Sequence, residues 1–442
     1  MEGQYERRRH GREPGRAPEP KTIRSSMPAP GRVCEVVRPR PDIRAVAVAC
    51  AAWDGLCDAS PVNVLIYGDT EHSPALRHEL PVAIGDPFLY LESGGRRAVV
   101  TNALEEDRIA AAAPDIERLL QDALGSDALL AEGRTRADAD AEVCVRAVAA
   151  LGIRSAIVPA EFPLALADRL RAAGVELTPD EAPFAERRRR KSAAELAGIR
   201  RASAAALAAM AEAARMLREA AIDGEQLILA GETLTSEAVR ARIREVCANA
   251  GAPAPAAIMI KPTGPGASVG HEAGSGPLPA HTPIEVDLWP QDERSGCWSD
   301  MTRTFVRGEV SDTIAAIHRL VLEAHERACN AISPGIAAVD VYGVACDVFE
   351  AAGHATQRTK APGENLRDGF YFCLGHGVGL EVHEAPTLGR GDDSLLIAGD
   401  VLAVEPGTLD SAVGGTRVED LVLVTAEGCE RLTGSFSYGL VP

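Results

Sequence analysis

The stretch LGHGVGLEVHEAP (374–386) places two histidines, His376 and His383, seven residues apart and surrounds the first with glycines. A seven-residue spacing would place both histidines on one face of a helix. Three glycines between 375 and 379 oppose a helix, because each costs a helix interior about 1 kcal/mol. The stretch therefore predicts strand-like backbone that passes close to the groups around His376.

The composition of the 442-residue chain is that of a globular protein, with 46% hydrophobic and 25% charged residues. This length is sufficient for two domains and at least one large core. The formal net charge of −18 argues against a nucleic-acid partner. We expect no membrane span either, because no apolar run approaches the roughly 20 residues that a bilayer requires.

The ten cysteines are scattered and form no C-x-x-C pair, so neither a zinc ribbon nor a redox dithiol is indicated. This distribution favours a reduced, cytoplasmic protein. Residues 1–60 are rich in Arg and Pro. This composition predicts that the segment is poorly ordered, or that the start codon has been assigned too far upstream and the folded protein begins near Val62. A signal peptide is not expected, because no hydrophobic segment directly follows the basic N-terminus.

Residues 61–186 alternate between strand-like and helix-like runs, which predicts an α/β domain. The runs VNVLIYGD (62–69) and SAIVPA (155–160) are strand-like, and ADAEVCVRAVAALG (139–152) is helix-like. No catalytic constellation stands out in this part. The basic run at 187–191 is interpreted as a solvated boundary between two domains.

The part of the chain from 190 to 442 shows one pattern twice. A helix at 192–220, which begins with a Ser192–Glu195 capping box, and a second helix precede strand-like segments, and a helix at 312–333 opens a similar series. This repetition predicts two similar halves that face each other across a cleft.

Five residues from five segments of this part are candidate metal ligands. Most of them stand in apolar, strand-like surroundings: Asp287, Asp300, His376, Glu405 and Glu419. Each residue alone is most simply a strand-end carboxylate or a satisfied core histidine. Together they indicate a site, because burying one unpaired carboxylate costs several kcal/mol.

The charge of this group predicts two metal ions. Four carboxylates carry about four negative charges, which two divalent cations cancel. Oxygen ligands with a single imidazole suit Mn²⁺, Co²⁺, Fe²⁺ or Zn²⁺, and no cysteine motif favours a structural zinc site.

The motifs VDL…SDMTRTF, GHGVGLEVHEAP, VEPG and GTRVEDLVLVT occur in an order that resembles the M24 metallopeptidases. That family includes aminopeptidase P, prolidase and methionine aminopeptidase. The resemblance covers about 190–442, and the segment before it resembles the creatinase N-terminal domain. It implies an α/β N-terminal domain (61–186) and an α+β pita-bread catalytic domain (190–442) with pseudo-two-fold halves.

The resemblance also implies a role for each site residue. Asp287 would bind one metal ion, Asp300 and Glu419 would bridge two, and His376 and Glu405 would bind the other. His383 and His271 would face the substrate, and Arg417 would steady the bridging carboxylates. A homodimer is implied as well.

Three features bear on this resemblance. Asp287 and Asp300 are thirteen residues apart where the family usually has eleven, so we expect the extra residues in the hairpin turn. Asp292 is the rival first ligand, but it lies in polar sequence. Phe372 stands where proline-specific relatives carry histidine, which weakens Xaa-Pro specificity. MTRTF and VHEAP favour aminopeptidase P over methionine aminopeptidase.

The implied activity is hydrolysis of an N-terminal peptide bond of short peptides, of the Xaa-Pro aminopeptidase or dipeptidase type. A water activated between the metals would attack, and Glu405 is the candidate to pass its proton to the leaving amine. Two alternatives remain open. One is a non-catalytic pita-bread binding protein, and the other is hydrolase or lyase chemistry on a non-peptide metabolite.

Overall fold

The computed structural model describes residues 62–267 and 270–442, so the prediction for residues 1–60 lies outside the described residues. The predicted boundary near 186–190 falls at the connection between α6 (Ala182–Arg189) and α7 (Ala193–Glu219). The division into two domains stays a prediction. No helix within the described ranges has the length and apolar character that a membrane crossing requires. The cysteines in these ranges are free thiols.

One sheet holds the strands that precede residue 180, in the order β4-β3-β2-β1-β5-β6. Its strands are β1 (Val64–Gly68), β2 (Phe88–Ser93), β3 (Arg96–Thr101), β4 (Glu117–Leu120), β5 (Ser155–Val158) and β6 (Glu176–Pro179). β2 is antiparallel to both β1 and β3, whereas β1, β5 and β6 run parallel, as do β3 and β4. The predicted strands at 62–69 and 155–160 and the predicted helix at 139–152 are confirmed.

Both faces of this sheet are covered by helices. Leu65 and Leu89 belong to a core with residues of α3 (Ser126–Ala131), α4 (Arg136–Ala150) and α5 (Leu164–Ala172). The neighbouring Val64 and Ile66 belong to a core with residues of α1 (Pro74–Glu79) and α2 (Glu106–Ala112). Alternate side chains of a strand point to opposite faces, so continuously apolar strands are stable only between two helix layers.

The rest of the described chain repeats one arrangement, as the sequence pattern predicts. In the first half, α7 packs against α8 (Ser236–Asn249) beside a sheet of β10 (Met259–Pro262), β11 (Pro283–Leu288) and β12 (Met301–Val306). In the second half, α9 (Asp312–Ala331) packs against α10 (Ala338–Ala351). They accompany a sheet in the order β14-β13-β15-β18-β19, which comprises β13 (Gly375–Gly377), β14 (Glu384–Leu388), β15 (Val401–Val404), β18 (Asp420–Val424) and β19 (Cys429–Arg431).

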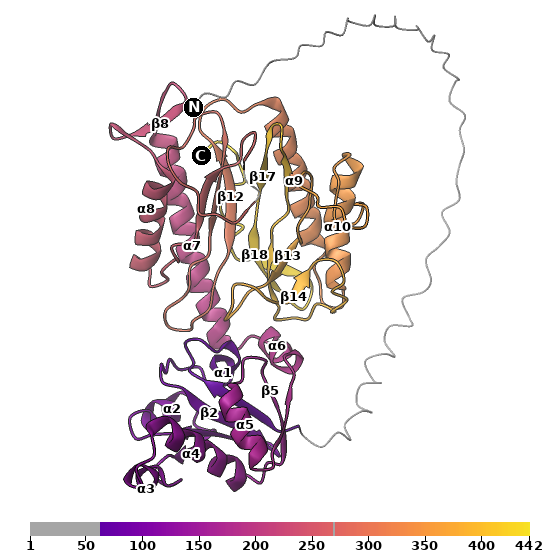
Figure 1. Cartoon of the computed structure of the whole chain (residues 1–442). Helices are drawn as coiled ribbons and strands as arrows, with labels where there is room; N and C mark the ends of the chain where they lie inside the picture. Colours follow the sequence, from indigo (N-terminus) through magenta and orange to yellow (C-terminus); the bar gives the residue numbers. More distant parts are fainter. Residues whose placement is uncertain (1–61, 268–269) are drawn as a thin grey trace, which may run out of the picture. The chain divides into compact units, whose positions relative to one another are not determined.

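Two smaller sheets complete the described strands: β16 (Gly407–Asp410) with β17 (Gly414–Arg417), and β7 (Ala221–Asp223) with β8 (Gln226–Leu229) and β9 (Glu232–Thr233). Figure 1 shows β12, β17, β18 and β13 between the α7/α8 pair and the α9/α10 pair. The two halves meet at an isolated bridge between Thr302 and Glu419. The side chain of Thr304 also donates a hydrogen bond to the Arg417 carbonyl at 2.9 Å.

The start of α7 is fixed by the predicted capping box. The Glu195 amide donates to Ser192 Oγ at 3.2 Å, and the Ser192 amide donates to Glu195 Oε2 at 2.6 Å. The basic run at 187–191, interpreted as solvated, is largely buried, so that interpretation is wrong: Arg188 and Arg189 are buried, and Lys191 forms a buried ion pair with Glu384 of β14. The long helix is thus tied at its beginning to the strand that follows His383.

One predicted strand is only partly correct. The run GLEVHEA (379–385) was expected to be extended, but residues 379–383 form bends and β14 begins at Glu384. The glycines before it have a packing reason. A Cβ on Gly375 would lie 1.9 Å from the Ala403 carbonyl oxygen, and one on Gly377 would lie 2.3 Å from that of Ala385. The bare backbone therefore admits close neighbours on both sides of His376.

Candidate metal centre

The five predicted ligands come from segments that end or begin at the junction of the two halves. Asp287 lies in β11, and Asp300 directly precedes β12. His376 is the middle residue of β13, Glu405 directly follows β15, and Glu419 lies between β17 and β18. All five side chains are buried.

These five residues line one cavity of about 690 Å³. Ligand atoms of Asp300, His376 and Glu419 all lie within 4.8 Å of one another. The His376 Nε2 atom is 3.6 Å from Glu405 Oε1 and 3.9 Å from Asp300 Oδ2. Thr302 donates a hydrogen bond to Glu419 Oε2 at 2.7 Å, which orients that carboxylate. The structure thus brings residues that are far apart in sequence to one point.

The buried guanidinium of Arg417 is the positive charge among these acids. It contacts Asp287 Oδ2, Glu405 Oε2 at 3.0 Å and Glu285 Oε1 at 3.3 Å. The Asp287 Oδ1 atom is buried and has no hydrogen-bond partner among the described residues. Since one guanidinium faces several carboxylates, the site retains excess negative charge.

The surroundings shift the pKa values of these groups in the directions expected of a cation site. Burial, followed by the charges of Glu419 and Asp287, raises the pKa of Asp300 well above its ordinary value. Burial, with the nearby Asp287 and Glu285, also raises the pKa of Glu405, to about 7. Burial lowers the pKa of His376 to about 4, so its ring is neutral at neutral pH. Crowded acids, an orphaned carboxylate oxygen and a neutral imidazole together fit divalent cations.

The two predicted substrate-side histidines also line the cavity, and both are exposed. The His383 ring lies 4.2 Å from the His376 ring, centroid to centroid. Burial and the neighbouring His271 lower the pKa of His383. Neither histidine is as enclosed as His376, so both are accessible to a molecule that enters.

The rival ligand Asp292 lies elsewhere. Its two carboxylate oxygens accept hydrogen bonds from Arg201 at 2.8 Å each, and Oδ2 also accepts from Ser295. Asp292 does not line the cavity and belongs to the connection between β11 and β12. That connection also contains the extra residues between the two aspartates. Phe372 does line the cavity, and its ring packs edge-on against Phe370 and Tyr371.

Comparison with known proteins assigns the family. The sequence profile of metallopeptidase family M24 matches residues 197–426, just over half of the chain. The chain belongs to metallopeptidase family M24.

The relatives of this M24 chain include an Xaa-Pro dipeptidase of Pyrococcus furiosus, which is 38% identical over 135 residues. That match covers 30% of this chain, and the chain spans only 35% of that relative's length. Among solved structures, an Xaa-Pro dipeptidase from Bacillus anthracis matches with a TM-score of 0.68 and 22% identity, over 86% of this chain and 94% of the other. An X-Pro aminopeptidase from Thermotoga maritima matches with a TM-score of 0.67 and 22% identity, over 85% of this chain and 96% of the other.

These structural likenesses show the fold of the M24 chain. The expected creatinase-like α/β part followed by a pita-bread part with two similar halves is confirmed.

Sequence reasoning missed several residues of this M24 site. Glu285 and Lys261 line the cavity, and they are opposite each other in the β10–β11 register. The signal for Glu285 was its place two residues before Asp287, since residues i and i+2 of a strand share a face. Thr302 gave no such signal, because its contact with Glu419 depends on how the two halves meet.

Proposed function

We propose that this M24 chain is a metal-dependent peptidase that hydrolyses the N-terminal peptide bond of short peptides, of the Xaa-Pro aminopeptidase or dipeptidase type. The observation that carries the proposal is the convergence of four carboxylates and one neutral imidazole in a single cavity. The Xaa-Pro dipeptidase and X-Pro aminopeptidase names of similar proteins support it.

The proposed site holds two divalent cations, with Mn²⁺ preferred over Co²⁺, Zn²⁺ or Fe²⁺. Asp287 would bind one ion, His376 and Glu405 would bind the other, and Asp300 and Glu419 would bridge them. Such ions, when bound, polarise a carbonyl oxygen and lower the pKa of water. Thr302 and Arg417 would hold the carboxylates in place through the contacts described above.

The other catalytic roles belong to side chains of this protein. Glu405 would move a proton from the attacking water to the leaving amine, because its carboxylate lies beside the position of that water. His383 and His271 would donate hydrogen bonds to the substrate as its carbonyl oxygen becomes negative. Phe372 supplies an apolar wall instead of a hydrogen-bonding group. We therefore propose that proline is not strictly required.

A substrate panel tests this function. An Xaa-Pro dipeptide, an Xaa-Pro tripeptide and matched non-proline peptides are incubated with the protein, with and without EDTA, and free amino acids are quantified. We expect cleavage that EDTA abolishes and that Mn²⁺ or Co²⁺ restores. Hydrolysis that survives exhaustive chelation would contradict the metal-dependent mechanism. If the metal-loaded protein cleaves none of the peptides, a binding protein or chemistry on a non-peptide metabolite would be favoured.

Cytoplasmic location and homodimeric assembly are further proposals. The scattered cysteines support the first, and the resemblance of the motifs supports the second. Light scattering on the protein as it elutes from a size-exclusion column tests the dimer. We expect about twice the chain mass, and a mass near 46.5 kDa would show a monomer.

A further inference from the structure

A second cavity, of about 580 Å³, lies in the α/β part and shares no lining residue with the metal centre. Tyr67 lies near the end of β1, Thr101 ends β3, and Gln121 directly follows β4. β1, β3 and β4 run in the same direction, so these residues mark the carboxyl edge of the sheet. Open α/β sheets bind ligands at this edge, in the crevice between connections that leave neighbouring strands toward opposite faces of the sheet.

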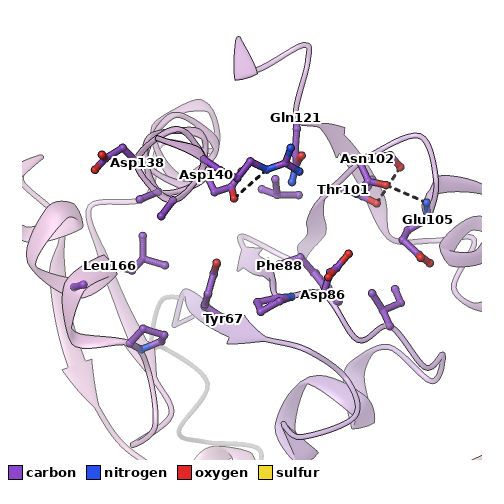
Figure 2. Close-up of a pocket in the computed structure, with 18 of the residues that line it drawn as sticks. Tyr67, Asp86, Phe88, Thr101, Asn102, Glu105, Gln121, Asp138, Asp140 and Leu166 are labelled. Carbon is purple, nitrogen blue, oxygen red and sulfur yellow. Dashed lines mark hydrogen bonds and ion pairs between the residues drawn. The ribbon is translucent and has the colours of Figure 1, made fainter. Parts of the chain in front are cut away.

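The wall of this cavity combines an apolar surface with a few polar groups. Helices from both faces contribute to it: Ile109 from α2, Ala141 from α4 and Leu166 from α5. Figure 2 shows the Tyr67 hydroxyl pointing into the open space between Asp140, Leu166 and Phe88. Volume and composition are those of a small-molecule site.

Several polar groups of this wall lack partners. Within residues 62–267 and 270–442, no hydrogen bond engages the Tyr67 hydroxyl, the Gln121 side-chain amide or the Asp86 carboxylate. Burial raises the pKa of Tyr67 to about 12, so the hydroxyl is protonated at neutral pH and can both donate and accept. These three groups are accessible from the cavity, whereas Asp140 Oδ1 is buried and has no hydrogen-bond partner among the described residues. A ligand with a hydrogen-bond donor would satisfy that oxygen.

The charge of the wall selects the sign of the ligand. Four carboxylates line the cavity, from Asp86, Glu105, Asp138 and Asp140, against the guanidinium groups of Arg136 and Arg169. Asp138 pairs with Arg169, and Glu105 pairs with Arg108. Figure 2 shows the Asp138 carboxylate directed away from the open space. Asp140 faces Arg136 at 3.5 Å, and Asp86 has no ion pair in the described part of the chain.

We propose that this cavity is a binding site for a small organic cation, an ammonium group that carries an aromatic or branched apolar body. The ammonium would lie near Asp86 and Asp140 and hydrogen-bond to the Tyr67 hydroxyl. The apolar body would pack against Phe88, Leu166 and Ile109, with the aromatic faces adding cation–π attraction.

Three probes of matched shape and different charge test this proposal on the full chain. Isothermal titration calorimetry compares 2-phenylethylamine, neutral 2-phenylethanol and anionic 3-phenylpropanoate. We expect the amine to bind, the alcohol to bind more weakly and the anion to show no binding. The proposal is overturned if none of the three binds, or if the alcohol or the anion matches the amine.

Variants place any binding in this cavity. Leu166→Trp fills the space and should abolish amine binding, whereas Asp86→Asn should weaken it roughly two- to fivefold. Asp168→Asn is the matched control, because Asp168 is an exposed residue of α5 outside the cavity wall. Wild-type affinity in a folded Leu166→Trp protein would contradict the assignment.

A measurement on the unmodified chain covers the case in which Leu166→Trp fails to fold. The side-chain amide resonances of Gln121 and Asn102, which both line the cavity, should shift as 2-phenylethylamine is added. Binding without shifts of these resonances would place the amine elsewhere and would overturn the proposal.

Discussion

His376 and His383 have the same side chain and opposite surroundings. His376 is buried among Asp300 and Glu405, whereas His383 is exposed at the cavity wall. The difference arises because β13 carries His376 inside the sheet, while His383 ends the bent segment before β14. The proposed roles follow from this difference: one ring binds a metal, and the other contacts the substrate.

Replacing His383 by Ala should therefore slow turnover and preserve metal content. The loss of one hydrogen-bonding or proton-transferring side chain typically costs about 10²- to 10⁴-fold in rate. Peptide hydrolysis and elemental analysis of the same sample provide the two readouts. His376→Ala is the matched variant and should lose metal as well as activity. A His383→Ala protein that is depleted of metal would contradict the division of roles.

For single residues, the character of the surrounding sequence was a better guide to the candidate ligand than the spacing between the aspartates. Asp287 was preferred to Asp292 because it ends an apolar run, and the structure places Asp287 in the cavity and Asp292 against Arg201. The roles of the ligands stay proposals. Glu285 was overlooked, although its alternation with Asp287 was visible in the sequence. Residues whose contacts cross between the halves, such as Thr302, could not be predicted from local sequence.

Among the elements, the junction of α6, α7 and β14 holds a group of buried charges outside the metal centre. The side chains of Lys191 and Glu384 are each 2% exposed, and Arg188 Nε lies 3.8 Å from the other Glu384 oxygen. Since Glu384 directly follows His383, this ion pair also fixes the end of the bent segment.

Removing one partner of this pair should destabilise the protein more than removing both charges. Lys191→Met leaves Glu384 without its closest cation, which we expect to cost about 3–5 kcal/mol. The Lys191→Met/Glu384→Gln double variant should recover a large part of that loss. Thermal melting of the two variants measures the difference. A double variant no more stable than Lys191→Met would contradict the buried ion-pair interpretation.

Elements with strong local signals were predictable, and those set by tertiary contact were not. The start of α7 follows from its capping box, which needs only residues 192–195. Residues 379–383 look extended because they alternate, but Gly379 lies against the Glu384 carboxylate and the backbone turns there. The two extra residues between Asp287 and Asp300 were expected in a turn, and the β11–β12 connection contains them.

For the whole molecule, a buried histidine that does not line the cavity links stability to pH. His325 of α9 is 2% exposed, and its Nε2 lies 3.5 Å from Asp420 Oδ2. Burial, aided by Arg431 and Arg303, lowers the pKa of His325 to about 4. The unfolded chain would take up this proton near pH 6.5, whereas the folded chain stays neutral, so acid favours unfolding.

The contribution of His325 should be fully present above about pH 6.5 and lost as pH falls towards 4. The loss amounts to about 3 kcal/mol, from the difference between the two pKa values. Melting temperatures of the wild type and His325→Gln, followed from pH 7.5 to 4, isolate this effect because all other groups are shared. A difference that stays constant across this range would contradict it.

We propose that two dications bind among four acids from remote parts of the chain and make their burial in one cavity tolerable. Elemental analysis after equilibration with Mn²⁺ and removal of free metal tests this directly, on the wild type, Asp300→Asn and the rival-ligand control Asp292→Asn. We expect about two metal ions per chain for the wild type and for Asp292→Asn, and a loss of both for Asp300→Asn. A wild-type protein that retains no metal, or an Asp300→Asn protein that retains as much as the wild type, would contradict it.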